Sequence, residues 1–220
     1  MRIWPPVWWE ERQKLRWQQV LPVAAAALAV LCVGYWVVSC LGPGRPNVVG
    51  TEEEVRFYRS LLDTGDAAAR AGAMRALAEM GDRASLPALR KGLADDEPLV
   101  VAAACVALGK LNDQASAEAI RGLLGHENPE VSAGAAEGAG MLRDQAAVEP
   151  LIKLLETTNA RPLLAAIVAL GQIGDPAAAK PLERLKEAPF EHLDPIPSDD
   201  EKARLEEAIA QALERVSAPR

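Results

Sequence analysis

Histidine, cysteine and aromatic side chains are scarce in this sequence of 220 residues. It contains two histidines and three cysteines, and aromatic residues make up 4 % of the chain although apolar residues make up half of it. Three cysteines are too few for a disulfide framework, and so little histidine and cysteine is poor material for a metal site. The sequence also lacks a phosphate-binding glycine loop and any evident nucleophile beside a base. We therefore expect no enzyme, no catalytic residue, no metal and no cofactor.

Positive charge is lacking over most of the chain. The total net charge is −7, residues 1–19 carry a net +2, and residues 20–44 carry no charge, so residues 45–220 carry −9. An acidic body of this kind repels the phosphate backbone of DNA and RNA. We therefore expect no nucleic-acid partner.

One long apolar run stands near the start of the chain. Residues 20–41 contain no charged side chain, and as a helix they would be about 33 Å long, enough to span a bilayer. A Trp-rich basic segment, residues 1–19, precedes the run, and a Gly/Pro linker, residues 42–50, follows it. Basic residues on the amino side predict a cytoplasmic N-terminus. We therefore expect a single-pass protein of the bacterial inner (cytoplasmic) membrane, with residues 51–220 periplasmic or extracellular.

The apolar run carries residues that suit a membrane surface. Five aromatic residues are predicted to anchor the chain at the interface: Trp8, Trp9, Trp17, Tyr35 and Trp36. The Trp-rich start is alternatively a docking segment against another membrane protein. A second alternative concerns Cys40, because VVSC at Val37–Cys40 resembles the bacterial lipobox. Lipidation at Cys40 would follow from that reading, although the segment before it is long for a lipoprotein signal.

The rest of the chain repeats itself every 31 residues. VALGKLND at Val106–Asp113 returns as VALGQIGD at Val168–Asp175, and Asp82 and Asp144 complete a series of aspartates with this spacing. Apolar residues recur within each copy at i, i+3 or i+4, and i+7, which is typical of a helix facing a core. Each aspartate is expected to N-cap a second helix. Each copy therefore predicts an antiparallel helix pair that buries its apolar face only by stacking on the next pair.

Stacked helix pairs predict an all-α fold, an α-solenoid over residues 51–220 preceded by a single transmembrane helix. Within the solenoid we expect a half-repeat cap at residues 51–66, four repeats at about residues 67–189, and a C-terminal capping helix at residues 199–217. This last helix should begin with the S-x-x-E capping box at Ser198–Glu201. Its apolar face carries Leu205, Ala208, Ile209, Ala212, Leu213 and Val216.

The repeats resemble a known family. VALGQIGDPAAAKPL, at Val168–Leu182, follows the pattern A-L-G-x-I-G-D-P-x-A-x-x-P-L of HEAT-like repeats, specifically the short type found in phycobilisome bilin lyases. The resemblance covers about Asp66–Leu185 and implies solenoid architecture, whereas unrelated functions share this repeat. It also implies an alternative function, a bilin-lyase-like enzyme or chaperone acting on a chromophore protein. Some HEAT-like enzymes, the deoxyhypusine hydroxylases, hold two irons with several His-Glu pairs, and the single pair His126-Glu127 is too few for such a centre.

Two surfaces of the solenoid are candidates for binding another protein. The second helices, which usually line the concave side of such solenoids, carry a basic stripe that could meet an acidic partner: Arg90, Lys91, Arg121, Lys153 and Arg184. The interleaved glutamates favour the alternative, an ordinary solvated face. The first helices are expected to expose apolar residues that would mark a contact patch if contiguous: Val101, Val106, Met141, Leu163 and Val168. Cys105 lies in the core-facing stripe, and we expect it to be a buried apolar residue.

Together these features predict a membrane-anchored protein–protein interaction scaffold. Its natural form would be an accessory subunit of a larger membrane protein complex. The expected partners are other membrane or periplasmic protein subunits, together with membrane lipid.

Overall fold

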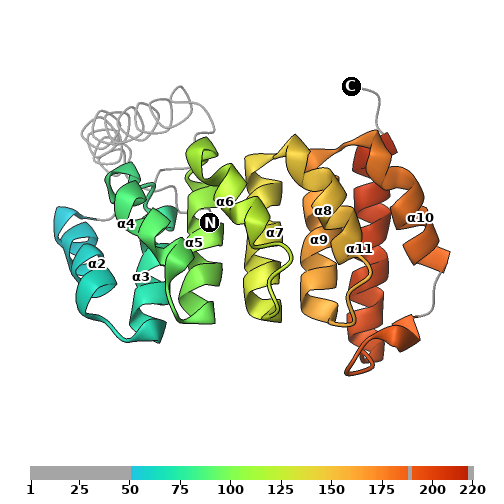
Figure 1. The fold of residues 1–220 in the computed structure, drawn as a ribbon, viewed down its shortest axis with the longest axis horizontal. Coiled ribbons are helices and arrows are strands. Elements are labelled where there is room, and N and C mark those ends of the chain that lie inside the picture. The colour runs from blue at the N-terminus through green and yellow to red at the C-terminus, as the bar shows by residue number, and fades with distance from the viewer. Residues whose placement is uncertain (1–50, 188–189, 218–220) are drawn as a thin grey trace, which may run out of the picture. The chain divides into compact units, whose positions relative to one another are not determined.

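The computed structural model describes residues 51–187 and 190–217, and within them every regular element is a helix (Figure 1). In this part of the chain no helix is both long enough and apolar enough to cross a membrane. The predicted basic segment, membrane span and linker at residues 1–50 lie outside the described residues. The same holds for the residues assigned to anchoring or lipidation, Trp8, Trp9, Trp17, Tyr35, Trp36 and Cys40.

The helices alternate between two layers along the chain. The first helices of the repeats are α3 (Ala67–Glu79), α5 (Pro98–Lys110), α7 (Pro129–Leu142) and α9 (Ala160–Ile173). The second helices are shorter: α4 (Leu86–Lys91), α6 (Ala117–Gly122), α8 (Val148–Leu154) and α10 (Ala179–Glu187). Helix α2 (Glu52–Thr64) packs on α3, and α11 (Asp199–Ser217) packs on α9 and α10. Figure 1 shows α3, α5, α7, α9 and α11 side by side, which confirms the predicted solenoid of stacked helical hairpins.

Short 3₁₀ helices join the two layers. One precedes each second helix: η1 (Arg83–Ser85), η3 (Gln114–Ser116), η4 (Gln145–Ala147) and η5 (Pro176–Ala178). Two others, η2 (Gly92–Ala94) and η6 (Phe190–His192), follow α4 and α10. As predicted, the carboxylates of Asp82, Asp144 and Asp175 cap these turns by accepting a hydrogen bond from the backbone N–H two residues later. Asp113 makes no such bond.

The core lies between the two layers and is built from the predicted apolar columns. The first helices bury Leu77, Leu108, Ala139 and Leu170, and the second helices bury Leu89, Ile120, Leu151 and Leu182. Cys105 is fully buried as expected, and loss of solvation raises the pKa of its thiol to about 12. At the C-terminal end, Ser198 and Glu201 form the predicted capping box through two reciprocal side chain–backbone hydrogen bonds of 2.9 and 3.4 Å.

Two residues expected on the exposed face are buried instead. Val101 and Leu163 are 6 % and 0 % exposed, so their prediction as part of an apolar surface patch was wrong. The reason is visible at Arg70, which holds the same place in the 31-residue register. Its guanidinium bonds Asp95, 2.8 Å away in the turn that follows the same helix pair and leads to α5. This register position therefore faces the connections between repeats, where an apolar side chain is covered.

Glycine and alanine let the first helices approach one another closely. A Cβ atom built on Gly134 of α7 would lie 2.7 Å from the Cα of Ala102 in α5, and one built on Gly138 would lie 2.6 Å from the carbonyl oxygen of Cys105. Real Cβ atoms do not tolerate such distances to backbone, so only glycine permits this packing. Successive second helices touch one another only marginally. The first helices therefore form the more closely packed layer.

Candidate interaction surfaces

Arginine–aspartate pairs connect neighbouring repeats along the second-helix layer. Arg59 in α2 bonds Asp82 with distances of 2.6 and 2.8 Å, and Arg90 in α4 bonds Asp113 with the same two distances. Arg121 in α6 continues the series by donating from its Nε to Asp144 over 3.0 Å. We call these three pairs the ladder. Ile152 occupies the next arginine position in the 31-residue register, and the ladder ends there.

Two carboxylates of the ladder, those of Asp82 and Asp113, have pKa values below the ordinary range. The hydrogen bond from Arg90 lowers the pKa of Asp113 below its ordinary range, and the one from Arg59 does the same for Asp82. In return, the hydrogen bond to Asp113 raises the pKa of Arg90. Asp113 is only 4 % exposed, so its charge depends on this partner and on the Ser116 hydroxyl, which also donates to it.

The ladder engages some residues of the basic stripe predicted on the second helices and leaves the others unpaired in the described part of the chain. Arg90 and Arg121 are engaged by aspartates of the next repeat. Lys91, Lys153 and Arg184 are exposed and make no ion pair within residues 51–187 and 190–217. The stripe is thus not one uniform row of available cations. Its role in binding stays a prediction.

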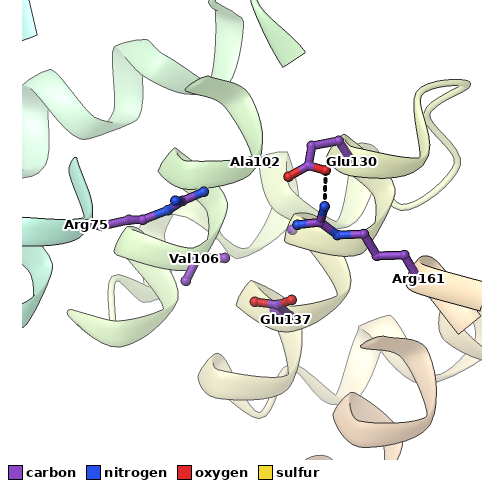
Figure 2. Close-up of a pocket in the computed structure, with 7 residues that line it drawn as sticks. Arg75, Ala102, Val106, Glu130, Glu137 and Arg161 are labelled. Atoms are coloured by element: carbon purple, nitrogen blue, oxygen red, sulfur yellow. Dashed lines mark ion pairs between the residues drawn. The ribbon is translucent and has the colours of Figure 1, made fainter. Parts of the chain in front are cut away.

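A groove opens on the first-helix face, the surface of the solenoid formed by α3, α5, α7 and α9 (Figure 2). Its cavity volume is about 280 Å³. Seven residues line it: Arg75, Ala102, Val106, Glu130, Gly134, Glu137 and Arg161. The groove forms because Ala102 and Gly134, which meet where α5 packs on α7, have too little side chain to fill the space above their contact.

Two arginines and two glutamates line the groove, and only one arginine and one glutamate among them form an ion pair. Arg161 of α9 forms an ion pair with Glu130 of α7 (Figure 2). Glu137 of α7 and Arg75 of α3 make no hydrogen bond or ion pair in the described part of the chain. Loss of solvation raises the pKa of Glu137, against the attraction of Arg161 and Arg75. The Glu137 side chain is exposed, and its carboxylate has no direct partner in the described part of the chain.

Sequence reasoning missed this groove, although one signal for it was readable. Arg75, Val106, Glu137 and Val168 occupy the same position in four successive copies of the 31-residue register. Val106 and Val168 were expected to be exposed, and they are half-buried and 39 % exposed, respectively. Arg75 and Glu137, the two charged members of this register position, carry no apolar signal, so the apolar pattern does not point to them.

A second hollow lies at the turns between the repeats, around α7 and the start of α9. Its cavity volume is about 310 Å³, and His126, Pro129 and Asn159 are among its lining residues. His126 is occupied by the turn itself, since its Nδ1 accepts a hydrogen bond of 3.0 Å from the backbone N–H of Asn128. Among the residues that the structure describes, no three histidine, cysteine or acidic side chains are grouped as metal ligands would be.

Comparisons with known proteins agree with this architecture. A family model described as HEAT repeats matches residues 56–128 and 117–192, which together make up more than half of the chain. The complex of CpcE and CpcF of phycocyanin lyase from Nostoc sp. PCC7120 has a similar structure, with a TM-score of 0.58 and 22 % identity over 79 % of this chain and 69 % of that chain. An engineered protein gives a TM-score of 0.53 and 23 % identity over 74 % of this chain and 79 % of its own. No curated protein matches the sequence. At these identities the structural similarities concern the fold alone.

Proposed function

The chain belongs to the family of HEAT-repeat proteins, and from this premise we propose that it is a scaffold whose solenoid holds another protein. The observation that carries the proposal is the first-helix face. The first helices of four repeats present equivalent positions there at regular spacing, and a groove lies between the helices. A solenoid contacts itself only between neighbouring repeats, so its long faces remain open to a partner.

Close packing makes this surface suitable for holding a partner. The backbones of α5 and α7 meet at Gly134 and Gly138, and the ladder joins the repeats on the other layer. A surface built on helices that cannot shift against one another loses little conformational freedom on binding. The proposed activity is therefore to position a partner rather than to transform a substrate.

We place the scaffold at a membrane. Residues 20–41 would span the bilayer, with residues 1–19 in the cytoplasm and the solenoid in the periplasm or outside the cell. The linker at residues 42–50 would keep the solenoid close to the bilayer, which raises its effective concentration near membrane partners. An accessory subunit of a larger membrane complex combines these properties. The partners would be other membrane or periplasmic subunits.

A second candidate function is that of a bilin-lyase-like enzyme or chaperone acting on a chromophore protein. It is favoured by the similarity in fold to the complex of CpcE and CpcF of phycocyanin lyase. Bilin added to the purified chain separates the two candidates. A stoichiometric shift of the bilin absorbance would support the second function, and an unchanged spectrum would support the scaffold.

Affinity purification of the full-length chain in mild detergent tests the scaffold directly. We expect at least one other membrane or periplasmic protein at a stoichiometric level, retained after the salt wash that removes surface-bound proteins. Recovery of the chain alone would contradict the proposal.

Orientation is tested by adding protease to intact spheroplasts. The solenoid should be removed while residues 1–19 survive, and an outward-facing membrane protein serves as the control. If the solenoid survives while that control is cut, the solenoid lies in the cytoplasm.

A further inference from the structure

We infer that the groove on the first-helix face binds a peptide segment of the partner protein that carries a lysine or arginine, with Glu137 as the opposing charge. The inference deepens the proposed function and rests on it. It assigns the contact to the first helices, whereas the sequence pattern pointed to basic residues on the second helices.

The shape of the groove suits a side chain that enters from a partner. Ala102 and Gly134 form its floor, and Val106 offers one half-buried apolar wall. A long aliphatic stem can lie against such a wall while its charged end reaches a carboxylate. Lysine and arginine have this build, with an apolar stem and a cationic end. Val168, at the equivalent register position on α9, is exposed and offers adjoining residues of the segment further apolar surface.

Two charged residues of the groove, Glu137 and Arg75, are left for a partner, and Glu137 is the one that can receive a basic side chain. Arg161 already neutralises Glu130, so these two residues need no further partner (Figure 2). Glu137 lies on α7 between Arg75 of α3 and Arg161 of α9, and it bonds neither of them. The Glu137 side chain is exposed and unpaired in the described part of the chain, so a cationic donor of the partner can reach its carboxylate and form a charge-assisted hydrogen bond.

The charge of the whole body favours the same class of partner. Residues 45–220 carry a net charge of −9, which attracts basic segments and repels acidic ones over long range. Arg75 is the single cation of the groove without an ion pair in the described part of the chain. Its guanidinium can donate hydrogen bonds to a backbone carbonyl or a carboxylate of the bound segment, which would fix the direction of that segment across the helices.

Site-specific crosslinking tests the inference with the full chain in its own cells. A benzophenone amino acid replaces Val106 in the groove, and in a separate strain it replaces Lys153 on the exposed surface of α8. After illumination, the crosslinked peptides are identified by mass spectrometry. We expect a crosslink from position 106 to a segment of another protein with a lysine or arginine next to the crosslinked residue, and a much weaker one from position 153.

Charge variants then decide whether Glu137 is the opposing charge. Glu137→Arg should lower the yield of the crosslink from position 106 by about tenfold or more, because like charges then meet in the groove. Glu137→Gln preserves the shape and should lower the yield less. Glu149→Arg is the matched control, since Glu149 is an exposed acid on α8, and it should leave the yield unchanged. Unchanged helical circular dichroism identifies the variants that are folded.

The outcomes separate this inference from the proposed function. A yield that Glu137→Arg leaves unchanged overturns the inference, as does a crosslinked segment without a basic residue or a crosslink from position 153 alone. In each of these cases a stoichiometric partner still supports the scaffold. If affinity purification yields no partner at all, the scaffold itself is contradicted. An acidic crosslinked segment would also overturn the inference, and it would indicate that Arg75 is the charge that the partner meets.

Discussion

Glycine at the contact between α5 and α7 leads to a prediction for which another glycine of the same chain serves as the control. Gly72 in α3 and Gly134 in α7 occupy the same register position, two repeats apart, in the interior of a first helix. Alanine in a helix interior is about 1 kcal/mol more favourable than glycine. Nothing lies within 4 Å of a Cβ atom built on Gly72, so Gly72→Ala should raise the free energy of unfolding by about that amount.

The same substitution at Gly134 meets backbone. Its Cβ would lie 2.7 Å from the Cα of Ala102 and 2.8 Å from the carbonyl oxygen of that residue, so α5 and α7 must separate. Overpacking of this kind costs about 1–3 kcal/mol. Because both variants share the gain in helix propensity, Gly134→Ala should be less stable than Gly72→Ala by about 1–3 kcal/mol. It should also weaken crosslinking from the groove, since Gly134 forms part of the floor.

Urea unfolding followed by helical circular dichroism measures this difference. The full chain in mild detergent is compared with the two single variants and the double variant. The two sites lie on α3 and α7, with α5 packed between these helices, so their effects should add within about 0.5 kcal/mol. If Gly134→Ala stabilises the chain as much as Gly72→Ala does, the first helices are not in backbone contact and the explanation of the groove fails with them.

Four further outcomes are expected. Asp113→Asn should lower the free energy of unfolding by about 1–3 kcal/mol, because it removes a charged hydrogen-bond acceptor, whereas Asp175→Asn, outside the ladder, should cost less in the same urea titration. The pKa of Asp113 is lowered in the folded chain, so its contribution is complete above the unfolded value of about 3.9 and is lost as the pH falls through the folded value; melting temperatures of Asp113→Asn should therefore fall less steeply in acid. The pKa of Glu137 is raised, so the free energy of unfolding should fall as the pH rises through the interval between its unfolded and folded values, and Glu137→Gln should remove that fall. Cys105 should resist N-ethylmaleimide at neutral pH until the chain is unfolded, as read by peptide mass; rapid labelling of the folded chain would contradict its burial.

The free energy of unfolding is predicted to depend on pH in opposite ways through Asp113 and Glu137. This difference separates a charge that is paired within the fold from one that is available to a partner. Asp113 has an arginine partner within the chain, and its ionised form stabilises the fold. Glu137 has no such partner in the described part of the chain, and its pKa is raised. A charged group that is satisfied within the chain has nothing left to offer a partner, whereas Glu137 is exposed and, among the described residues, unpaired.

Local features of this protein could be predicted from the sequence because they depend on residues close together in the chain. The capping box at Ser198–Glu201 and the aspartate caps involve atoms two or three residues apart. A second capping box at Thr51–Glu54 was equally readable in TEEE and was not predicted. The helix pairs and their stacking followed from the 31-residue register, since one pair cannot bury its own apolar face.

The amino-acid order thus determined the repeat, its helices and the residues of the core. Only the tertiary structure decided which equivalent positions face solvent and which are covered. Arg90 and Asp113 are 23 residues apart and meet because stacking sets one repeat against the next. Leu163 is buried under a connection, and Glu137 remains open above a glycine contact, although both are first-helix residues. A register states which residues are alike, whereas exposure depends on how closely neighbouring helices approach, and that distance is set by side chains from separate repeats.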